Sequence, residues 1–138
     1  MNIHRPYKDL IDCLNAAGLR PTRQRLALAK LLFAGAKRHI SAECLHGEAT
    51  AKGVSVSLAT VYNNLNQFTA AGLLREVVVD SSRSYFDTNT TNHHHFFIEE
   101  DGRLVDIPDE ELLLARLPEI PEGTSIDRVD ITIRLKKS

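Results

Sequence analysis

The chain is poor in cysteine and has no long apolar run. Its 138 residues include only two cysteines, Cys13 and Cys44, and no Cys-x-x-Cys pair. This excludes a structural zinc site of four cysteines and fits a reducing compartment better than a disulfide scaffold. No stretch approaches the roughly 18 to 20 consecutive apolar residues of a membrane helix, and the first residues lack the apolar segment of a signal peptide. We therefore expect a cytoplasmic protein without a membrane segment.

The chain also lacks an excess of either charge, since its net charge is -1. Taken alone, this value argues against a nucleic-acid-binding protein. However, residues 1–79 hold ten Lys and Arg against five Asp and Glu, a balance of +5, whereas residues 80–138 hold seven against 13, a balance of -6. The asymmetry predicts one module that faces a polyanion and a second module with another task, although chance partition of a mixed surface would give the same numbers.

Four helices are predicted in the first half by apolar residues at helical spacing. Three of them begin at a hydroxyl side chain that can cap the first turn, and all four end near a glycine. The expected helices lie before Gly18, from Thr22 to Gly35, from Ser41 to Gly53 and from Ser57 to Gly72. Cys13 falls on the first helix, where we expect it in the core.

After the fourth predicted helix, the sequence pattern changes from helix-like to strand-like. Residues 73–79 are rich in β-branched side chains, residues 80–83 have turn chemistry, and residues 84–87 can return as a second strand. Helices followed by a small hairpin are the layout of a winged helix-turn-helix, which we place at residues 1–87. The polar residues 88–92 are interpreted as a linker.

The second module, residues 93–138, is small and mixed. Strands are expected at 93–98 and 103–107, a short helix at 109–117, and an alternating strand at 129–135. About 45 residues are too few to bury a core alone comfortably, so the apolar strand face is expected to meet a second copy of the chain. The predicted fold is α+β: a winged helix followed by a small α/β dimerisation domain.

The fourth predicted helix carries a second, polar face. Its amide and hydroxyl side chains recur at helical spacing, and amides can pair with adenine edges while a Tyr ring can lie against thymine methyls. Basic residues nearby would hold phosphates and fix the register on DNA. An ordinary solvated helix face is the alternative. The candidate DNA-contacting residues are Arg20, Arg23, Arg25, Ser57, Thr60, Tyr62, Asn63, Asn64 and Gln67.

Three consecutive histidines, His93, His94 and His95, open the second module. In a strand, His93 and His95 share one face and form an imidazole clamp suited to a divalent metal such as Zn, Fe, Mn or Co. If Asp101 and Gly102 make a two-residue turn, Asp106 lies opposite Phe97 and on the same face as His95. The set could be completed by Asp87 and His39, which would tie the two modules together. Hydrated histidines at a polar strand start are the alternative.

These residues resemble the ferric uptake regulator (Fur) superfamily over nearly the whole chain. The matching segments are 18–25, 39–43, 58–62 (Leu-Ala-Thr-Val-Tyr), 65–68, 71–73, 86–87, 93–95 and 102–106. The resemblance implies a dimeric bacterial transcription factor with an N-terminal winged helix and a C-terminal dimerisation domain. It also implies an inter-domain regulatory metal site at His39, Asp87, His93, His95 and Asp106, and a DNA-reading tyrosine at Tyr62.

Departures from the superfamily pattern indicate which branch of the superfamily the chain resembles. The Cys-x-x-Cys zinc ligands are absent, Asn92 and Val129 stand where relatives often have His, and Asn63 replaces a frequent Arg. Together with the triple histidine, these departures resemble the iron response regulator (Irr) branch, whose members respond to haem. Since Cys13 is followed by Leu14 rather than Pro, any haem is expected at His93, His94 and His95.

We therefore expect a homodimeric repressor of iron- and haem-related genes that binds a dyad, A/T-rich operator. Its effectors would be a divalent metal (Mn, Fe or Zn) at the domain junction and haem at the histidine cluster. An enzyme is not expected, because a metal-dependent hydrolase needs a nucleophile or general base that no motif here supplies. The alternatives are a metal or haem buffering protein and another Fur-like repressor that responds to metal or peroxide.

Overall fold

The computed structural model describes residues 6–91, 93–107 and 117–138, and the chain divides into two compact units, Met1–Thr90 (unit 1) and Thr91–Ser138 (unit 2). Residues 88–90 of the expected linker thus belong to unit 1. The helix expected at 109–117 falls almost wholly on residues outside the described ranges. None of the helices in these ranges has the length and hydropathy of a membrane span.

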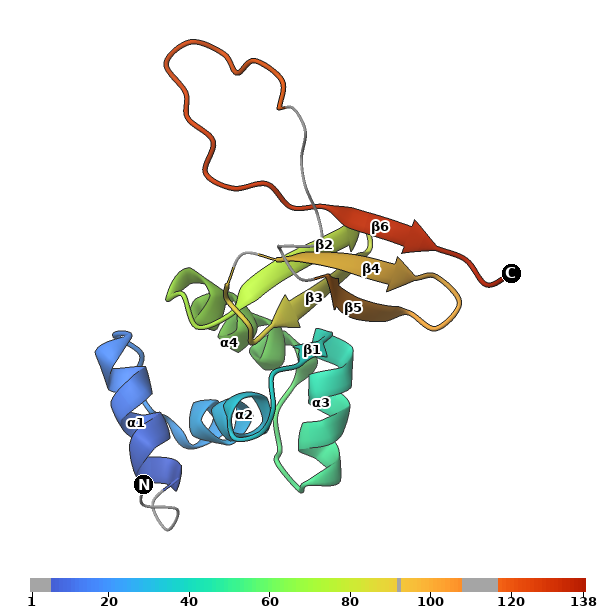
Figure 1. Cartoon of the computed structure of the whole chain (residues 1–138). Helices are drawn as coiled ribbons and strands as arrows, with labels where there is room; N and C mark the ends of the chain where they lie inside the picture. Colours follow the sequence, from blue (N-terminus) through green and yellow to red (C-terminus); the bar gives the residue numbers. More distant parts are fainter. Residues whose placement is uncertain (1–5, 92, 108–116) are drawn as a thin grey trace. The chain divides into compact units, whose positions relative to one another are not determined.

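Unit 1 is built from helices α1 (Pro6–Ala16), α2 (Arg23–Phe33), α3 (Ala42–Ala51) and α4 (Leu58–Ala70) (Figure 1). The predicted caps are confirmed: the hydroxyls of Thr22, Ser41 and Ser57 accept the backbone N–H three residues further on, at 3.1–3.2 Å. At the end of α4, Gly72 has φ +80°, which lets Leu73 N–H bond the carbonyl of Phe68 at 2.9 Å. These local signals explain why the helices begin and end near the expected residues.

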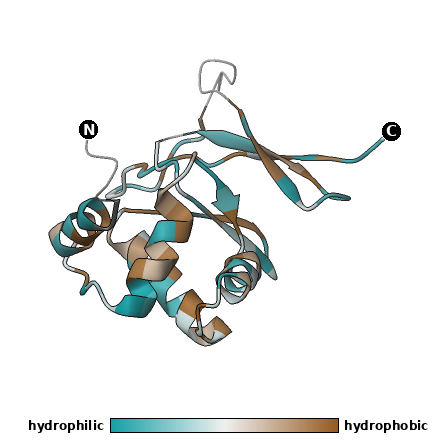
Figure 2. Ribbon diagram, turned by 90° about the horizontal axis from the view of Figure 1, so that it is seen from below, coloured by the Kyte–Doolittle hydropathy of each residue, from teal (hydrophilic) through white to brown (hydrophobic). Residues whose placement is uncertain are grey.

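The core of unit 1 lies among its helices and takes in Phe86 from the hairpin. Its largest fully buried side chains include Phe68, Leu28 and Leu65. Figure 2 shows the apolar and polar stretches alternating along these helices. The prediction that Cys13 lies in this core is wrong: Cys13 is exposed on α1, and the adjacent Leu14 is buried. One residue turns the side chain by about 100° around a helix, so the two neighbours cannot share a face.

A three-stranded antiparallel sheet completes unit 1, in the order β1-β3-β2. The strands are β1 (His39–Ile40), β2 (Arg75–Asp80) and β3 (Arg83–Asp87). The hairpin of β2 and β3 after α4 confirms the winged-helix layout. Strand β1 was not predicted, because two residues carry no periodic signal. A register irregularity between Val78 and Asp80 shifts the hairpin pairing, so that Arg75 lies opposite Asp87.

Unit 2 is a second three-stranded sheet, in the order β5-β4-β6, and residues 117–131 lead into β6 without a helix or strand (Figure 1). Strand β4 (His94–Ile98) pairs antiparallel with β5 (Arg103–Ile107) and parallel with β6 (Thr132–Leu135). The mixed helices and sheets confirm the predicted α+β class.

The hairpin of β4 and β5 does not close with the two-residue turn on which the expected pairing of Asp106 with Phe97 depended. Ile98 pairs with Arg103, so residues 99–102 form a four-residue loop, closed by a bond from Gly102 N–H to the Ile98 carbonyl at 2.9 Å. Gly102 has φ +61°, a conformation that favours glycine. As a result Asp106 lies directly opposite His95 rather than Phe97.

Candidate metal centre and nucleic-acid interface

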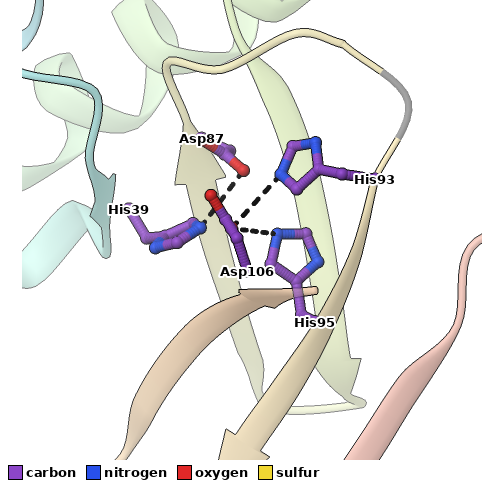
Figure 3. Close-up of side chains that lie close together, drawn as sticks. All are labelled: His39, Asp87, His93, His95 and Asp106. Carbon is purple, nitrogen blue, oxygen red and sulfur yellow. Dashed lines mark ion pairs between the residues drawn. The ribbon is translucent and has the colours of Figure 1, made fainter. Parts of the chain in front are cut away.

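Unit 1 places a histidine and a carboxylate on neighbouring strands. His39 of β1 lies opposite Asp87 of β3, and His39 Nε2 is 3.2 Å from Asp87 Oδ2 (Figure 3). The Asp87 side chain is 1% exposed, and its Oδ1 accepts the backbone N–H of Asn89 at 2.8 Å. The backbone thus orients one carboxylate oxygen, while the other faces the imidazole. We call His39 and Asp87 the unit 1 half-site.

Unit 2 places two histidines around one carboxylate. His93 Nε2 and His95 Nε2 each lie 3.3 Å from Asp106 Oδ1 (Figure 3), and the two imidazole centroids are 4.6 Å apart. His93 and His95 are buried, whereas the Asp106 side chain is 42% exposed. We call His93, His95 and Asp106 the unit 2 half-site; the predicted shared face of His93 and His95 is confirmed.

The two ring nitrogens of His93 have different partners. His93 Nδ1 is 2.6 Å from the carbonyl oxygen of Thr91. A carbonyl only accepts hydrogen bonds, so Nδ1 donates to it, and Nε2, which faces Asp106, is the ring nitrogen left to bind a metal. A hydrogen bond of this kind orients the imidazoles that bind metals in proteins.

His94 has a different task from its two neighbours. Its Nδ1 accepts the backbone N–H of Ile131 at 3.1 Å, just before β6. The imidazole therefore helps to fasten the segment leading into β6, and its Nδ1 lone pair is occupied by this bond. Of the three consecutive histidines, two belong to the half-site and one supports the sheet.

The donor sets of both half-sites suit the same kind of cation. They consist of imidazole nitrogens and carboxylate oxygens, and the two cysteines lie elsewhere, exposed on α1 and α3. Nitrogen and oxygen donors favour hard or borderline divalent ions such as Mn, Fe or Zn. The residues of each half-site, two donors in unit 1 and three in unit 2, are therefore of the kind that binds a divalent metal.

The expected polar stripe of α4 is not fully exposed, and the prediction is wrong at Asn64. Asn64 is 6% exposed, its Nδ2 donates to the Thr60 carbonyl at 2.9 Å, and its Oδ1 accepts Arg25 Nε at 2.9 Å. Arg25 also donates to Gln67 Oε1 and to the Arg20 carbonyl. The bonds to Asn64 and Gln67 join α2 to α4, so Asn64 and Arg25 are occupied in packing the helices.

The exposed part of α4 is formed by other members of the predicted set. Tyr62, Asn63 and Gln67 are exposed, and Ser57 caps the helix and donates to Thr60 Oγ1 at 2.9 Å. Tyr62 donates to the carboxylate of Glu43 at 2.6 Å, which raises the pKa of the Tyr62 hydroxyl. Glu43 was not predicted to take part, and only a helix-packing argument between α3 and α4 could have identified it.

Two of the predicted phosphate contacts remain available at the surface. Arg20, three residues before α2, and Arg23, its first residue, are exposed, whereas Arg25 is half-buried. The wing carries another guanidinium, since Arg83 bonds Asp80 across the turn between β2 and β3, with its Nε 2.9 Å from Asp80 Oδ2. Arg83 was not predicted as a site residue, although its turn position and charge were visible.

The sequence matches known proteins along most of its length. The model of the ferric uptake regulator family matches residues 16–135. The peroxide-responsive repressor PerR of Staphylococcus epidermidis is 35% identical over 105 residues, which are 76% of this chain and 69% of that protein. PerR of Staphylococcus aureus strain USA300 is 33% identical over 105 residues, covering 76% and 70%.

Solved structures agree with the sequence matches. The ferric uptake regulator of Pseudomonas aeruginosa, determined with manganese, has a TM-score of 0.69 at 26% identity, over 91% of this chain and 96% of that one. The ferric uptake regulator of Vibrio cholerae has a TM-score of 0.74 at 24% identity, over 94% and 100%. The second likeness concerns the fold alone.

Proposed function

The chain belongs to the ferric uptake regulator family, whose members are transcription regulators and not enzymes, and we propose that it is a metal-responsive DNA-binding repressor. In this proposal one divalent cation, Mn, Fe or Zn, joins the two half-sites. The observation that carries it is that both half-sites direct an imidazole Nε2 at a carboxylate. The proposed ligands are His39, Asp87, His93, His95 and Asp106.

Chain connectivity supports a shared cation. Only five residues separate Asp87 from His93, so their Cα atoms can be at most about 20 Å apart even on a fully extended backbone. The two half-sites are therefore tethered at high effective concentration, whichever way the units turn. Two donors from unit 1 alone make a weak site, whereas five donors from both units make a strong one.

The regulatory consequence follows from this geometry. When bound, the cation supplies a positive charge that all five side chains share. His39 and Asp87 would then hold the winged helix to unit 2, and unit 2 would pair with a second copy of the chain. Two winged helices at a fixed spacing fit a dyad operator, so the ligands couple cation binding to DNA affinity.

DNA contact is proposed through α4 and the start of α2. The exposed Tyr62 and Asn63 are the candidates for base contact, and Arg20 and Arg23 for phosphate contact. The operator is expected to be A/T-rich, as the amide and tyrosine side chains favour. A chromosomal target also requires the cytoplasmic location expected from the sequence.

Footprinting on the native promoters, with Mn²⁺ present or chelated, tests the proposal. We expect protection only with Mn²⁺, and we expect His39→Ala to bind DNA equally weakly in both conditions. His46→Ala is the matched control, because His46 bonds the Val56 carbonyl away from both half-sites. DNA binding that survives chelation unchanged would contradict the metal switch, and no DNA binding at all would favour a buffering protein.

Haem is proposed as a second effector, at His93, His94 and His95, with iron- and haem-related genes as targets. The support is the triple histidine and the resemblance to the iron response regulator branch. Because His93 and His95 direct the same Nε2 atoms at Asp106, haem and the divalent cation would exclude one another. A haem titration should give a Soret shift that Mn²⁺ suppresses and that replacement of all three histidines by Ala removes.

A response to peroxide is the other candidate, favoured by the 33–35% identity to peroxide-responsive repressors. Fe²⁺ reacts with hydrogen peroxide, whereas Mn²⁺ does not readily do so. Hydrogen peroxide should therefore release DNA from the Fe²⁺-loaded protein and leave the Mn²⁺-loaded protein bound. Equal retention of DNA in both forms would remove this candidate.

A further inference from the structure

Three charged or ionisable residues form one row across the sheet of unit 1. Asp87 of the central strand β3 lies opposite His39 of β1 on one side and opposite Arg75 of β2 on the other. Directly opposed residues of antiparallel strands point to the same face, so these three side chains share a face. Figure 1 shows the three strands in this order. Arg75 is thus a sheet neighbour of a proposed metal ligand.

Both Arg75 and Asp87 are withdrawn from water. Arg75 is 5% exposed and Asp87 is 1% exposed. An arginine is charged at all accessible pH values and is almost never buried unless it is paired. Among the buried residues that the structure describes, Asp87 is the only carboxylate. The opposed position and the shared burial therefore make Asp87 the natural counter-charge of Arg75.

We propose that Arg75 is a charge-compensating residue that stabilises Asp87 in the metal-free protein and thereby weakens its affinity for the divalent cation. This inference rests on the metal site of the proposed function. A buried carboxylate without a cation is costly, and Arg75 offsets that cost until the metal arrives. The same guanidinium then repels the incoming divalent charge. Arg75 would set the metal concentration at which the repressor responds.

Whether Arg75→Met raises or lowers the affinity for Mn²⁺ distinguishes this role of Arg75 from a purely structural one. Mn²⁺ affinity is measured by competition with a fluorescent chelator for the wild type, Arg75→Met and Arg75→Lys. Methionine keeps much of the length without the charge, so we expect binding on the order of tenfold tighter. Lysine keeps the charge, so we expect wild-type affinity. If Arg75 only supported the fold, Arg75→Met would bind Mn²⁺ equally or more weakly, and the inference would be wrong.

A second measurement needs no metal. With a chelator present, Arg75→Met leaves the buried Asp87 carboxylate without the guanidinium that compensates its charge. Adding Asp87→Asn removes the carboxylate charge but keeps an oxygen that can accept the Asn89 N–H. The double variant should therefore unfold at a higher temperature than Arg75→Met alone. A double variant that unfolds at the same or a lower temperature overturns the inference. Arg75→Gln replaces Arg75→Met in both measurements if the latter does not fold.

These outcomes keep the inference apart from the proposed function. If the wild type binds Mn²⁺ but Arg75→Met does not bind it more tightly, the inference falls and the metal switch stands. If the wild type binds no Mn²⁺ at all, the metal switch falls, and the role of Arg75 in setting affinity falls with it.

Discussion

The two units bury polar side chains for different purposes. In unit 1 the buried Asn64 and Thr88 bond to Arg25 and Arg38 and hold helices and strands together. In unit 2 the buried polar residues within the described ranges are the three consecutive histidines, two of which form the half-site. A substitution of Asn64 or Thr88 should therefore change stability first, whereas one of His93 or His95 should change ligand binding first, as should one of Asp87 in the unit 1 half-site.

The two units also differ in the size of their apolar cores. Thirteen buried hydrophobic residues form one cluster in unit 1, twelve of them from its helices and sheet and one, Leu74, from the residue before β2. In the described part of unit 2, the buried hydrophobic residues are Phe97, Leu104 and Ile107. Unit 1 thus has the core of an independent domain, and unit 2 has a thin sheet that depends more on its ligands and partners.

The largest expected effect tests the core of unit 1. Phe68 is fully buried and packs edge-on against Phe33, with ring centroids 5.8 Å apart. Phe68→Ala should lower the free energy of unfolding by about 3–5 kcal/mol, because it removes apolar contact and leaves a cavity. Denaturant unfolding followed by circular dichroism measures this change. Val78→Ala, at a side chain that is 61% exposed, is the control and should change stability by less than about 0.5 kcal/mol.

The next effect tests the half-site of unit 2. His95→Ala removes an imidazole from beside Asp106 and should weaken Mn²⁺ binding by about 100-fold or more, because a direct ligand is lost. Isothermal titration calorimetry measures the affinity. His94→Asn is the matched control, since an amide oxygen can replace Nδ1 as the acceptor of Ile131 N–H. Equal losses in both variants would mean that the histidine run acts through folding and not as separate ligands.

Two adjacent asparagines of α4 give a smaller but sharper contrast. Asn64→Ala removes the acceptor of Arg25 Nε and should cost about 1–3 kcal/mol of unfolding free energy. Asn63→Ala changes an exposed side chain and should leave stability within about 0.5 kcal/mol of the wild type. Fluorescence anisotropy with an operator fragment should show weaker DNA binding for Asn63→Ala. If Asn63→Ala changes stability and not DNA affinity, the assignment of the exposed face is wrong.

The helical periodicity of α4 did not decide whether Asn64 is buried or exposed. Asn64 follows Val61 by three residues and precedes Phe68 by four, so it fits the apolar stripe as well as the polar one. Its chemistry favoured the polar stripe. Burial was decided by Arg25, a partner 39 positions away on another helix, and no local pattern reports such a partner.

Sheet register was predictable only where the strands are regular. Alternation along β4 and β5 correctly predicts that His95 and Asp106 lie on the same face of the sheet. The four-residue loop changes which residues are directly opposite, so that Asp106 pairs with His95 and not with Phe97. In the hairpin of β2 and β3, Asp80 pairs with Arg83. If that register continued unchanged along both strands, Thr88 would lie opposite Arg75. The shift between Val78 and Asp80 brings Asp87 there instead. Bulges depend on local backbone geometry that residue types do not encode, so the row of His39, Asp87 and Arg75 was not foreseeable.

The smallest expected effect concerns the wing of unit 1. Asp80 bonds the Arg83 guanidinium and the N–H and hydroxyl of Ser82, and these contacts hold the pKa of the Asp80 carboxyl well below its usual range. A carboxyl whose pKa is lower in the folded state than in the unfolded state stabilises the fold while it is ionised. Its contribution is complete above the unfolded-state pKa of about 3.9 and is lost as the pH falls toward the native value.

The wild type should therefore melt slightly above Asp80→Asn at pH 7, and the difference should shrink as the pH falls below about 4. Thermal melts across that range provide the measurement, and Asp101→Asn, which removes the same charge from the loop between β4 and β5, is the control. A gap that stays constant with pH would mean that Asp80 acts through its hydrogen bonds to Ser82, which Asn can partly replace, and not through its charge. The wing would then be held by turn geometry, like the loop between β4 and β5, where Gly102 closes the turn by its backbone conformation.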